Sequence, residues 1–172
     1  ILILGGVGPA AGVDLHRLII EKTPHITNDQ DHRRVIHLSF SDIIPDRTIS
    51  LNTNTPDIPS HNMALLVESI LPICNTFKSK VVVGIPCNTF HADPIFSEFL
   101  KKVEPYKETV KVINMIDETV EHICSRIEKG SKVGLLSTTG TRNFKLYDNK
   151  LERKGFTTLF PLDQDRIHSS IY

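Results

Sequence analysis

The sequence predicts an α/β protein with parallel strands, and three observations lead to this fold class. Short apolar runs such as ILIL at 1–4 and KVVVGI at 80–85 alternate with segments of helical period. These Val, Ile and Leu runs are nearly unbroken, which is typical of parallel strands that helices cover on both faces. A strand, a small-residue turn and a helix follow one another at 1–19 and again at 132–151, a weak internal repeat that predicts two similar halves.

The first elements are marked by apolar runs and by the breaks between them. ILIL at 1–4 predicts a strand, and residues 11–21 have the period of a helix. The apolar side chains of that helix are expected on one face: Val13, Leu15, Leu18 and Ile19. RVIHLSF at 34–40 predicts the next strand, from which a loop rich in Pro, Asn, Thr and Asp runs as far as Ser60.

The later elements continue the alternation. A helix at about 61–77 precedes the strand at 80–85, and Asp93 as N-cap with Pro94 in the first turn begins the next helix. The remaining elements are a strand at 109–113, a helix that Gly130 stops after Lys129, a strand at 132–137 and a helix from about Arg142 to Lys154.

Composition excludes several classes of function. The chain has 172 residues, 40% of them hydrophobic and 23% charged, as expected of a globular protein that buries a core. Twenty basic residues balance twenty acidic ones, so no net field attracts nucleic acid or an anionic membrane. We find no run of 18 apolar residues and no signal peptide, so we expect a cytoplasmic protein.

The chain begins at Ile1, inside a strand-like run and without Met, so we expect the natural protein to be longer. The three cysteines form no disulfide framework and no zinc-ligand spacing, which favours free thiols. Among the eight histidines, no i, i+4 pair on a clear helix has a third ligand nearby. We therefore expect no metal site.

Ligands of parallel sheets bind beyond the carboxyl ends of the strands, and the first such end is GGVGPAAG at 5–12. Gly5, Gly6 and Gly8 allow close approach of a ligand to the backbone, and the following helix directs its positive end toward it. The match to the dinucleotide fingerprint is partial, because Pro9 lacks an N–H and no Gly-Lys-Ser/Thr follows. Nucleotide binding and a tight turn without a ligand both remain open.

The second end is IPCNTFHAD at 85–93. Cys87 follows Pro86 and lies near the start of a helix, which favours the thiolate form. Asn88 and Thr89 add hydrogen-bond donors suited to a carboxylate, and His91 either orients the cysteine or is a polar residue of the first helical turn. Buried, inert packing is the competing interpretation of Cys87.

The other two thiols differ from Cys87. Cys74 and Cys124 lie within amphipathic helices among Leu and Ile residues, which predicts that both belong to the core. The third strand end is LLSTTGTRN at 135–143, where a strand again opens into small and hydroxylated residues before a helix.

The residues now support a family resemblance. ILILGGVGPAAG, IPDRT at 44–48, IPCNTFHAD and GLLSTTGT resemble, in this order, the aspartate/glutamate racemase family, with aspartate racemases the nearest branch. The resemblance covers essentially the whole chain. It implies two pseudo-symmetric flavodoxin-like α/β halves with parallel sheets, an active site at their interface, no cofactor and one catalytic cysteine from each half. We expect the first half at 1–114 and the start of the second at 115–172.

The resemblance also implies roles for individual residues. Cys87 is the expected catalytic residue, and Arg47 resembles the residue that reads the side-chain carboxylate, for which a guanidinium fork is suited. A solvated loop arginine is the competing interpretation of Arg47. Val7 stands where the family often has Met, in a wall of the pocket. The complete set of expected substrate-binding residues is Val7, Arg47, Asn88, Thr89, Thr138, Thr139, Gly140 and Thr141.

Two features depart from the family pattern. The second catalytic cysteine lies in a Gly-Cys-Thr-Glu-like motif that this sequence does not contain, and the spacing of the repeat would place it near residue 212, past Tyr172. Some aspartate racemases use a lysine near 162–172 to bind the side-chain carboxylate. Alignment by eye places Asp165, beside Arg166, at that position, which makes aspartate less secure as the substrate than racemisation itself.

The predicted function is cofactor-independent racemisation of an acidic amino acid, aspartate or glutamate, by two cysteines of which Cys87 is one. Removal of a proton from one face of the α-carbon and its return to the other requires two acid/base groups. Two alternatives remain: a decarboxylase or cis–trans isomerase of small carboxylates, and a protein that only binds acidic ligands. We expect a small-molecule substrate, no nucleic acid or membrane partner, and a possible homodimer.

Overall fold

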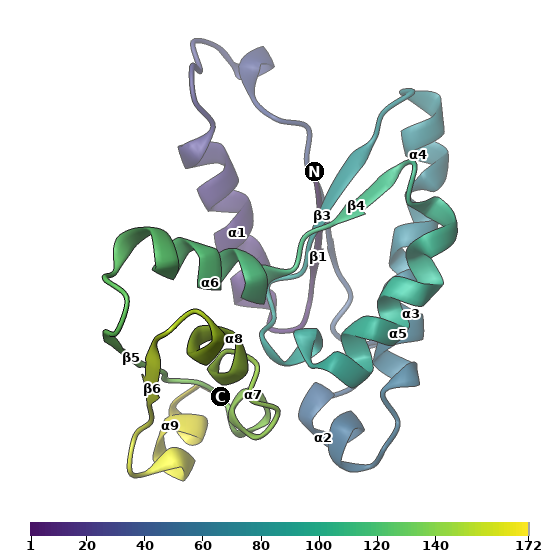
Figure 1. Cartoon of the computed structure of the whole chain (residues 1–172). Helices are drawn as coiled ribbons and strands as arrows, with labels where there is room; N and C mark the ends of the chain where they lie inside the picture. The colour runs from purple at the N-terminus through teal and green to yellow at the C-terminus, as the bar shows by residue number, and fades with distance from the viewer. Residues whose placement is uncertain (172) are drawn as a thin grey trace.

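The computed structural model describes residues 1–171 and contains two parallel sheets (Figure 1). The first has four strands in the order β2-β1-β3-β4, and the second has the order β5-β6. All strand pairs are parallel, which confirms the predicted α/β class. The strands are β1 (Leu2–Gly5), β2 (Ile36–Ser39), β3 (Val81–Gly84), β4 (Val110–Val112), β5 (Lys132–Gly134) and β6 (Thr157–Leu159).

Helices cover the four-stranded sheet from two sides. One side carries α1, which contacts β1 and β2, and the other carries the packed pair α3 and α5 (Figure 1). The α-helices are α1 (Pro9–Lys22), α2 (Arg47–Asn52), α3 (Asp57–Ser69), α4 (Leu71–Thr76), α5 (Asp93–Val103), α6 (Met115–Arg126), α7 (Thr139–Asn143), α8 (Asp148–Arg153) and α9 (Gln164–Ile171). Short 3₁₀ turns occur at Asp29–Asp31, Thr89–His91 and Glu104–Tyr106.

Two helices that the sequence predicted as continuous are each broken. The helix expected at 61–77 divides into α3 and α4, because Pro72 lacks the N–H that would bond one turn back. The helix expected at 142–154 divides into α7 and α8 where Lys145 adopts a left-handed φ of 49°. Near the start of α5 the N-cap is Ala92, so Asp93 is the first helical residue and the predicted cap was one position late.

The loop predicted as far as Ser60 contains α2 and the first residues of α3. The strand β6 and the helix α9 were not predicted from the sequence. Both follow the last predicted helix, in a polar segment whose short apolar stretches give little periodic signal.

The apolar face of α1 was predicted incorrectly. Val13 is 63% exposed and Leu18 is 37% exposed, whereas Gly12 is the buried residue of this helix. A Cβ at Gly12 would lie 2.6 Å from Nε2 of His37 on β2, so the absence of a side chain sets how closely α1 approaches the sheet. Full cover of both faces was also an overestimate, since Val82 of β3 is 43% exposed.

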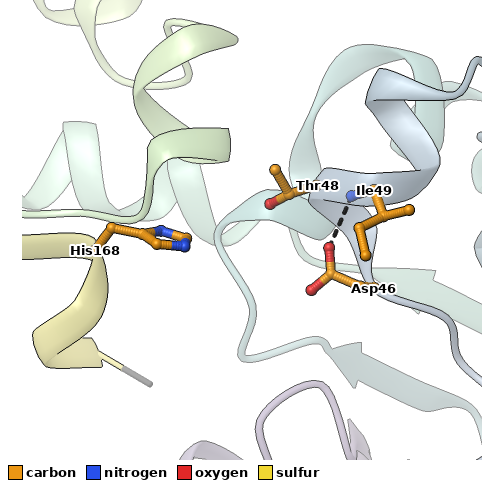
Figure 2. Close-up of a pocket in the computed structure, with 4 residues that line it drawn as sticks. All are labelled: Asp46, Thr48, Ile49 and His168. Carbon is orange, nitrogen blue, oxygen red and sulfur yellow. Dashed lines mark hydrogen bonds between the residues drawn. The ribbon is translucent and has the colours of Figure 1, made fainter. Parts of the chain in front are cut away.

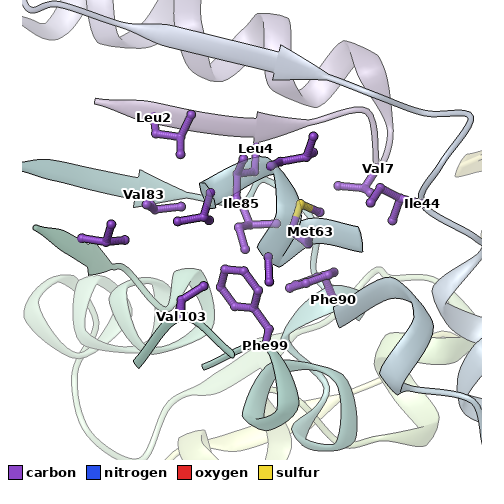
Figure 3. Close-up of a cluster of buried hydrophobic side chains, with 14 of the residues drawn as sticks. Leu2, Leu4, Val7, Ile44, Met63, Val83, Ile85, Phe90, Phe99 and Val103 are labelled. Atoms are coloured by element: carbon purple, nitrogen blue, oxygen red, sulfur yellow. The ribbon is translucent and has the colours of Figure 1, made fainter. Parts of the chain in front are cut away.

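The larger apolar core lies between the four-stranded sheet and the helices α3 and α5 (Figure 3). Leu2 and Leu4 of β1 and Val83 of β3 are completely buried in it. Phe90 and Phe99 meet edge to face in the same core, with ring centroids 5.5 Å apart. Phe90 thus fixes the 3₁₀ turn that directly follows Cys87.

A second core forms around α6, α8 and β6 from seven buried residues: Ala92, Ile116, Val120, Leu146, Tyr147, Leu151 and Phe156. Six of the seven follow residue 114, and Ala92 comes from the segment between Cys87 and α5. The segment from Cys87 to Ala92, called the Cys87 segment below, therefore lies where the two cores meet. The division at 114/115 and the pseudo-symmetry of the two halves remain predictions.

His91 connects the Cys87 segment to the start of α6. Its Nδ1 donates to the carbonyl of Cys87 at 2.8 Å, and its Nε2 accepts from the N–H of Met115 at 3.3 Å. Neutral imidazole with a proton on Nδ1 satisfies both partners. Burial lowers the pKa of His91, and the hydrogen bonds that the protonated ring would donate to the carbonyls of Cys87 and Ile113 oppose that effect in part. These two hydrogen bonds agree with both interpretations of this residue, an orienting role and a polar residue satisfied in the first helical turn.

Replacing His91 should weaken the dependence of stability on pH. Because the pKa is lower in the folded state, the unfolded chain binds the proton more readily once the pH falls below about 6.5, and the fold loses stability there. The loss is at most about 1.4 kcal/mol per pH unit. We expect the difference in unfolding free energy between pH 7.5 and 5.5, measured by urea denaturation, to be smaller in His91→Gln than in the wild type.

His61→Gln is the matched control, since His61 is an exposed histidine on α3. Its side chain is hydrated in the folded and the unfolded state, so its loss should leave the difference unchanged. A His91→Gln variant with the wild-type pH dependence would contradict the assignment of a buried, neutral His91.

Candidate active site

Cys87 lies just beyond the carboxyl end of β3, after Ile85 and Pro86. Its N–H donates to the carbonyl of Ile85 at 2.8 Å, which closes a tight turn around the proline. The side chain is 9% exposed, and the residue is followed directly by the 3₁₀ turn at 89–91. A thiol held in this way is shielded from water but lies where ligands of parallel sheets bind.

The other two cysteines are placed as the sequence predicted for core residues. Cys74 of α4 is 4% exposed and belongs to the larger core. Cys124 of α6 is partly buried and packs against the second core. All three thiols are free.

Three threonine hydroxyls converge beside the Cys87 segment. Oγ1 of Thr89 lies 3.3 Å from Oγ1 of Thr138 and 3.3 Å from Oγ1 of Thr141, and the latter two are 3.2 Å apart. Thr138 is the N-cap of α7 and accepts from the N–H of Thr141. The structure therefore brings together three predicted site residues from segments about 50 positions apart.

Gly140 makes this close approach possible. A Cβ at Gly140 would lie 2.5 Å from Oγ1 of Thr48 and 3.0 Å from Cγ2 of Thr89. Any larger residue would push α7 away from α2 and from the 3₁₀ turn. Thr48 was not among the predicted site residues, although it belongs to the IPDRT stretch that carried part of the family resemblance.

Arg47 and Val7 are also neighbours, as both predicted roles require. The guanidinium donates to the carbonyl of Val7 at 3.4 Å and to that of Pro45 at 3.3 Å. Its Nε is buried and has no partner among residues 1–171. A buried N–H donor without an acceptor is costly, so this atom is suited to receive a ligand oxygen. The half-buried Arg47 is therefore no solvated loop arginine.

Asn88 is held by a residue that was not predicted from the sequence. Its Oδ1 accepts from the hydroxyl of Tyr147 at 2.6 Å. Tyr147 is 8% exposed, and burial raises the pKa of its phenol while a hydrogen bond with Thr119 acts against the rise. The phenol is thus neutral and keeps its proton for donation.

A cavity of about 300 Å³ opens between α2 and α9 and is lined by Asp46, Thr48, Ile49 and His168 (Figure 2). The His168 ring points toward Asp46 and Thr48, and its Nδ1 accepts from the N–H of Thr139 at 3.3 Å. Alignment by eye placed Asp165 at the position of a substrate-binding lysine. Asp165 is exposed, and the residue that α9 turns toward the cavity is His168, one turn later.

The glycine-rich turn packs against the neighbouring strand. Gly6 has φ of 85°, and a Cβ there would lie 2.8 Å from the backbone nitrogen of Phe40. A Cβ at Gly5 would lie 2.6 Å from Nε2 of His37, so both glycines serve close packing within the protein. A Cβ at Gly8 would meet no atom within 4 Å, which leaves this position alone open to a ligand.

The described part of the chain also bears on metal binding and on membrane insertion. Residues 1–171 contain no group of three or more His, Cys, Asp or Glu side chains arranged to hold a metal ion. Over the same residues, no helix has the length and apolar character needed to cross a bilayer.

Comparison with known proteins agrees with this geometry. Residues 4–171 match the family model described as Asp/Glu/Hydantoin racemase. The structure resembles the aspartate racemase of Picrophilus torridus, with a TM-score of 0.77 and 29% identity over 99% of this chain and 65% of that protein. An aspartate racemase homologue from Pyrococcus horikoshii has the same fold, with a TM-score of 0.67, 18% identity and coverage of 99% and 68%. The chain thus spans less than two thirds of the Picrophilus protein, and it belongs to the Asp/Glu/hydantoin racemase family.

Proposed function

We propose that the protein racemises an acidic amino acid without a cofactor and that Cys87 is one of the two acid/base groups. The observation that carries the proposal is the placement of Cys87 at the end of β3, next to Asn88 and the cluster of Thr89, Thr138 and Thr141. A base and several carboxylate-binding donors are thus adjacent. Membership of the racemase family supports the same reaction type.

The reaction needs acid/base groups on both faces of the α-carbon. Cys87 as a thiolate removes the α-proton from one face, and a second group returns a proton to the other. Cys74 and Cys124 lie within the helices α4 and α6 and not at the carboxyl end of a strand, so we do not assign them that task. In our proposal the second group is the second catalytic cysteine that the family resemblance implies.

Stabilising the carbanion is the harder part of the chemistry. When the α-proton leaves, negative charge moves onto the α-carboxylate, and donors already aimed at that carboxylate stabilise the charge as it develops. The amide of Asn88, the three clustered threonine hydroxyls and the backbone of Thr139–Thr141 are the donors that we assign to it. Positions fixed before the reaction lower the barrier most, and the close contacts at Gly140 fix them here.

Arg47 is assigned to the second carboxylate of the substrate. Its guanidinium is half-buried, it donates to neutral carbonyl oxygens, and its Nε has no partner in the described residues. An anionic side chain would supply the missing acceptor and the missing countercharge. Val7 borders the same position through its carbonyl.

Cys87 can be tested by proton NMR of the full-length protein in D2O with L-aspartate and, separately, L-glutamate. We expect loss of the α-proton signal together with formation of the D-enantiomer for at least one of them. Cys87→Ala should abolish formation of the D-enantiomer, because it removes the base from one face. Cys124→Ala is the matched control and should retain activity.

The other outcomes of this experiment are equally informative. Exchange without inversion would mean that only one face carries a working base, which contradicts the two-base mechanism. No exchange with either amino acid would refute the proposed activity in favour of another small-carboxylate reaction or of ligand binding alone.

Arg47→Lys tests how the substrate side chain is recognised. Lysine keeps the positive charge but loses the planar fork and the buried Nε donor. We expect KM for the preferred acidic amino acid to rise about tenfold or more, with a smaller change in kcat, because the distal carboxylate is bound in both the ground state and the transition state. Steady-state kinetics on both enantiomers would measure this.

Arg17→Lys provides the control for this substitution. Arg17 forms ion pairs with Asp14 and Glu21 on the exposed face of α1, so its replacement should leave KM unchanged. An Arg47→Lys enzyme with wild-type KM would remove Arg47 from the binding site.

A further inference from the structure

The side chain of Asn88 has two chemically different ends, and only one of them suits a carboxylate. The Nδ2 end donates two hydrogen bonds, whereas the Oδ1 end only accepts and would repel a carboxylate oxygen. If Asn88 binds the α-carboxylate, as the proposed function requires, its amide must be held with Nδ2 toward the substrate. The residues around Oδ1 decide whether this orientation is fixed.

We propose that Tyr147 is a positioning residue that fixes the amide of Asn88, so that the two Nδ2–H donors face the α-carboxylate of the substrate. The hydroxyl oxygen of Tyr147 lies 2.6 Å from Oδ1 of Asn88. Two oxygens this close share a hydrogen bond, and a carbonyl oxygen has no proton to give, so Tyr147 is the donor. Rotation of the amide by half a turn would place Nδ2 against the hydroxyl oxygen at 2.6 Å, which is shorter than an ordinary N–H···O bond.

The hydroxyl of Tyr147 is itself held in place by packing. The ring is one of the seven buried residues of the second core and is 8% exposed. It lies in the connection between α7 and α8, whereas Asn88 belongs to the Cys87 segment, 59 positions earlier. A donor fixed by a packed ring orients its acceptor more strictly than one on a mobile side chain.

A second contact from the same side strengthens this assignment. His91, three residues after Asn88, accepts from the N–H of Met115 at the start of α6. The segment that carries Cys87 is therefore held through Asn88, Thr89 and His91 by residues that follow position 114. Tyr147 acts on the orientation of Asn88, and His91 acts on the carbonyl of Cys87.

Tyr147→Phe is the test, because phenylalanine keeps the packed ring and removes only the hydroxyl. We expect kcat/KM of the full-length enzyme for its acidic amino acid to fall about tenfold, because the exposed Asn88 amide would lose the hydrogen bond that orients it. Tyr106→Phe is the matched control. The hydroxyl of Tyr106 forms a hydrogen bond with Glu68, and the residue packs against the larger core. Removal of this hydroxyl should leave kcat/KM unchanged.

A double-mutant cycle separates positioning from general support of the fold. If Tyr147 acts through Asn88, the Tyr147→Phe change should alter kcat/KM less than twofold in an Asn88→Ala background. A tenfold loss in both backgrounds would overturn the proposal, because the hydroxyl would then act elsewhere. Wild-type kcat/KM in Tyr147→Phe would overturn it as well.

A measurement without turnover keeps this test independent of the proposed activity. In ¹⁵N-correlated NMR spectra, the Asn88 side-chain NH₂ pair is identified by its absence in Asn88→Ala. We expect this pair to shift in Tyr147→Phe but not in Tyr106→Phe. An unmoved pair would refute the role of Tyr147, whereas a shifted pair in a protein without racemase activity would refute the proposed function and retain the orientation of Asn88.

Discussion

The structure of the site depends on the hydrogen bonds that hold residues 87–91 where the two cores meet. Asn88, Thr89 and His91 all bond to groups that follow position 114: a tyrosine hydroxyl, two threonine hydroxyls and a backbone N–H. Cys87 is anchored through its backbone, because its N–H and its carbonyl are both occupied. The thiol is thereby left for chemistry in a segment that is otherwise fixed.

These hydrogen bonds matter more for the geometry of the site than for the overall stability of the fold. Each neutral hydrogen bond adds only about 1 kcal/mol net, because the unfolded chain bonds to water instead. Leaving one group of a buried network without its partner costs more free energy than one such bond contributes. The hydrogen bonds of the network therefore tend to form together or not at all. The close contact of Gly140 with Thr48 and Thr89 adds a steric condition, since these hydroxyls meet only if the backbones come together.

Sequence reasoning succeeded where local chemistry decides the structure. The strand ends and the turn at Gly6 followed from apolar runs and small residues, and the three threonines of the cluster were selected by the family resemblance. Helix breaks were missed because a single left-handed residue such as Lys145 leaves no periodic signal. Val13 was wrongly assigned to the buried face of α1, because helical periodicity identifies an apolar face but not whether another element packs against it. Tyr147 could not have been found, since a hydroxyl partner 59 residues away is a property of the fold.

In the proposed reaction, the charge around Arg47 favours an acidic substrate over a neutral one. A half-buried guanidinium needs a countercharge, and its hydrogen-bond partners here are the carbonyls of Val7 and Pro45. The neighbouring Asp46 uses Oδ1 to cap α2 and lines the cavity between α2 and α9. A substrate carboxylate at Nε would complete both the hydrogen bonding and the charge of Arg47. A neutral side chain could supply only the acceptor, and the guanidinium would remain without a countercharge.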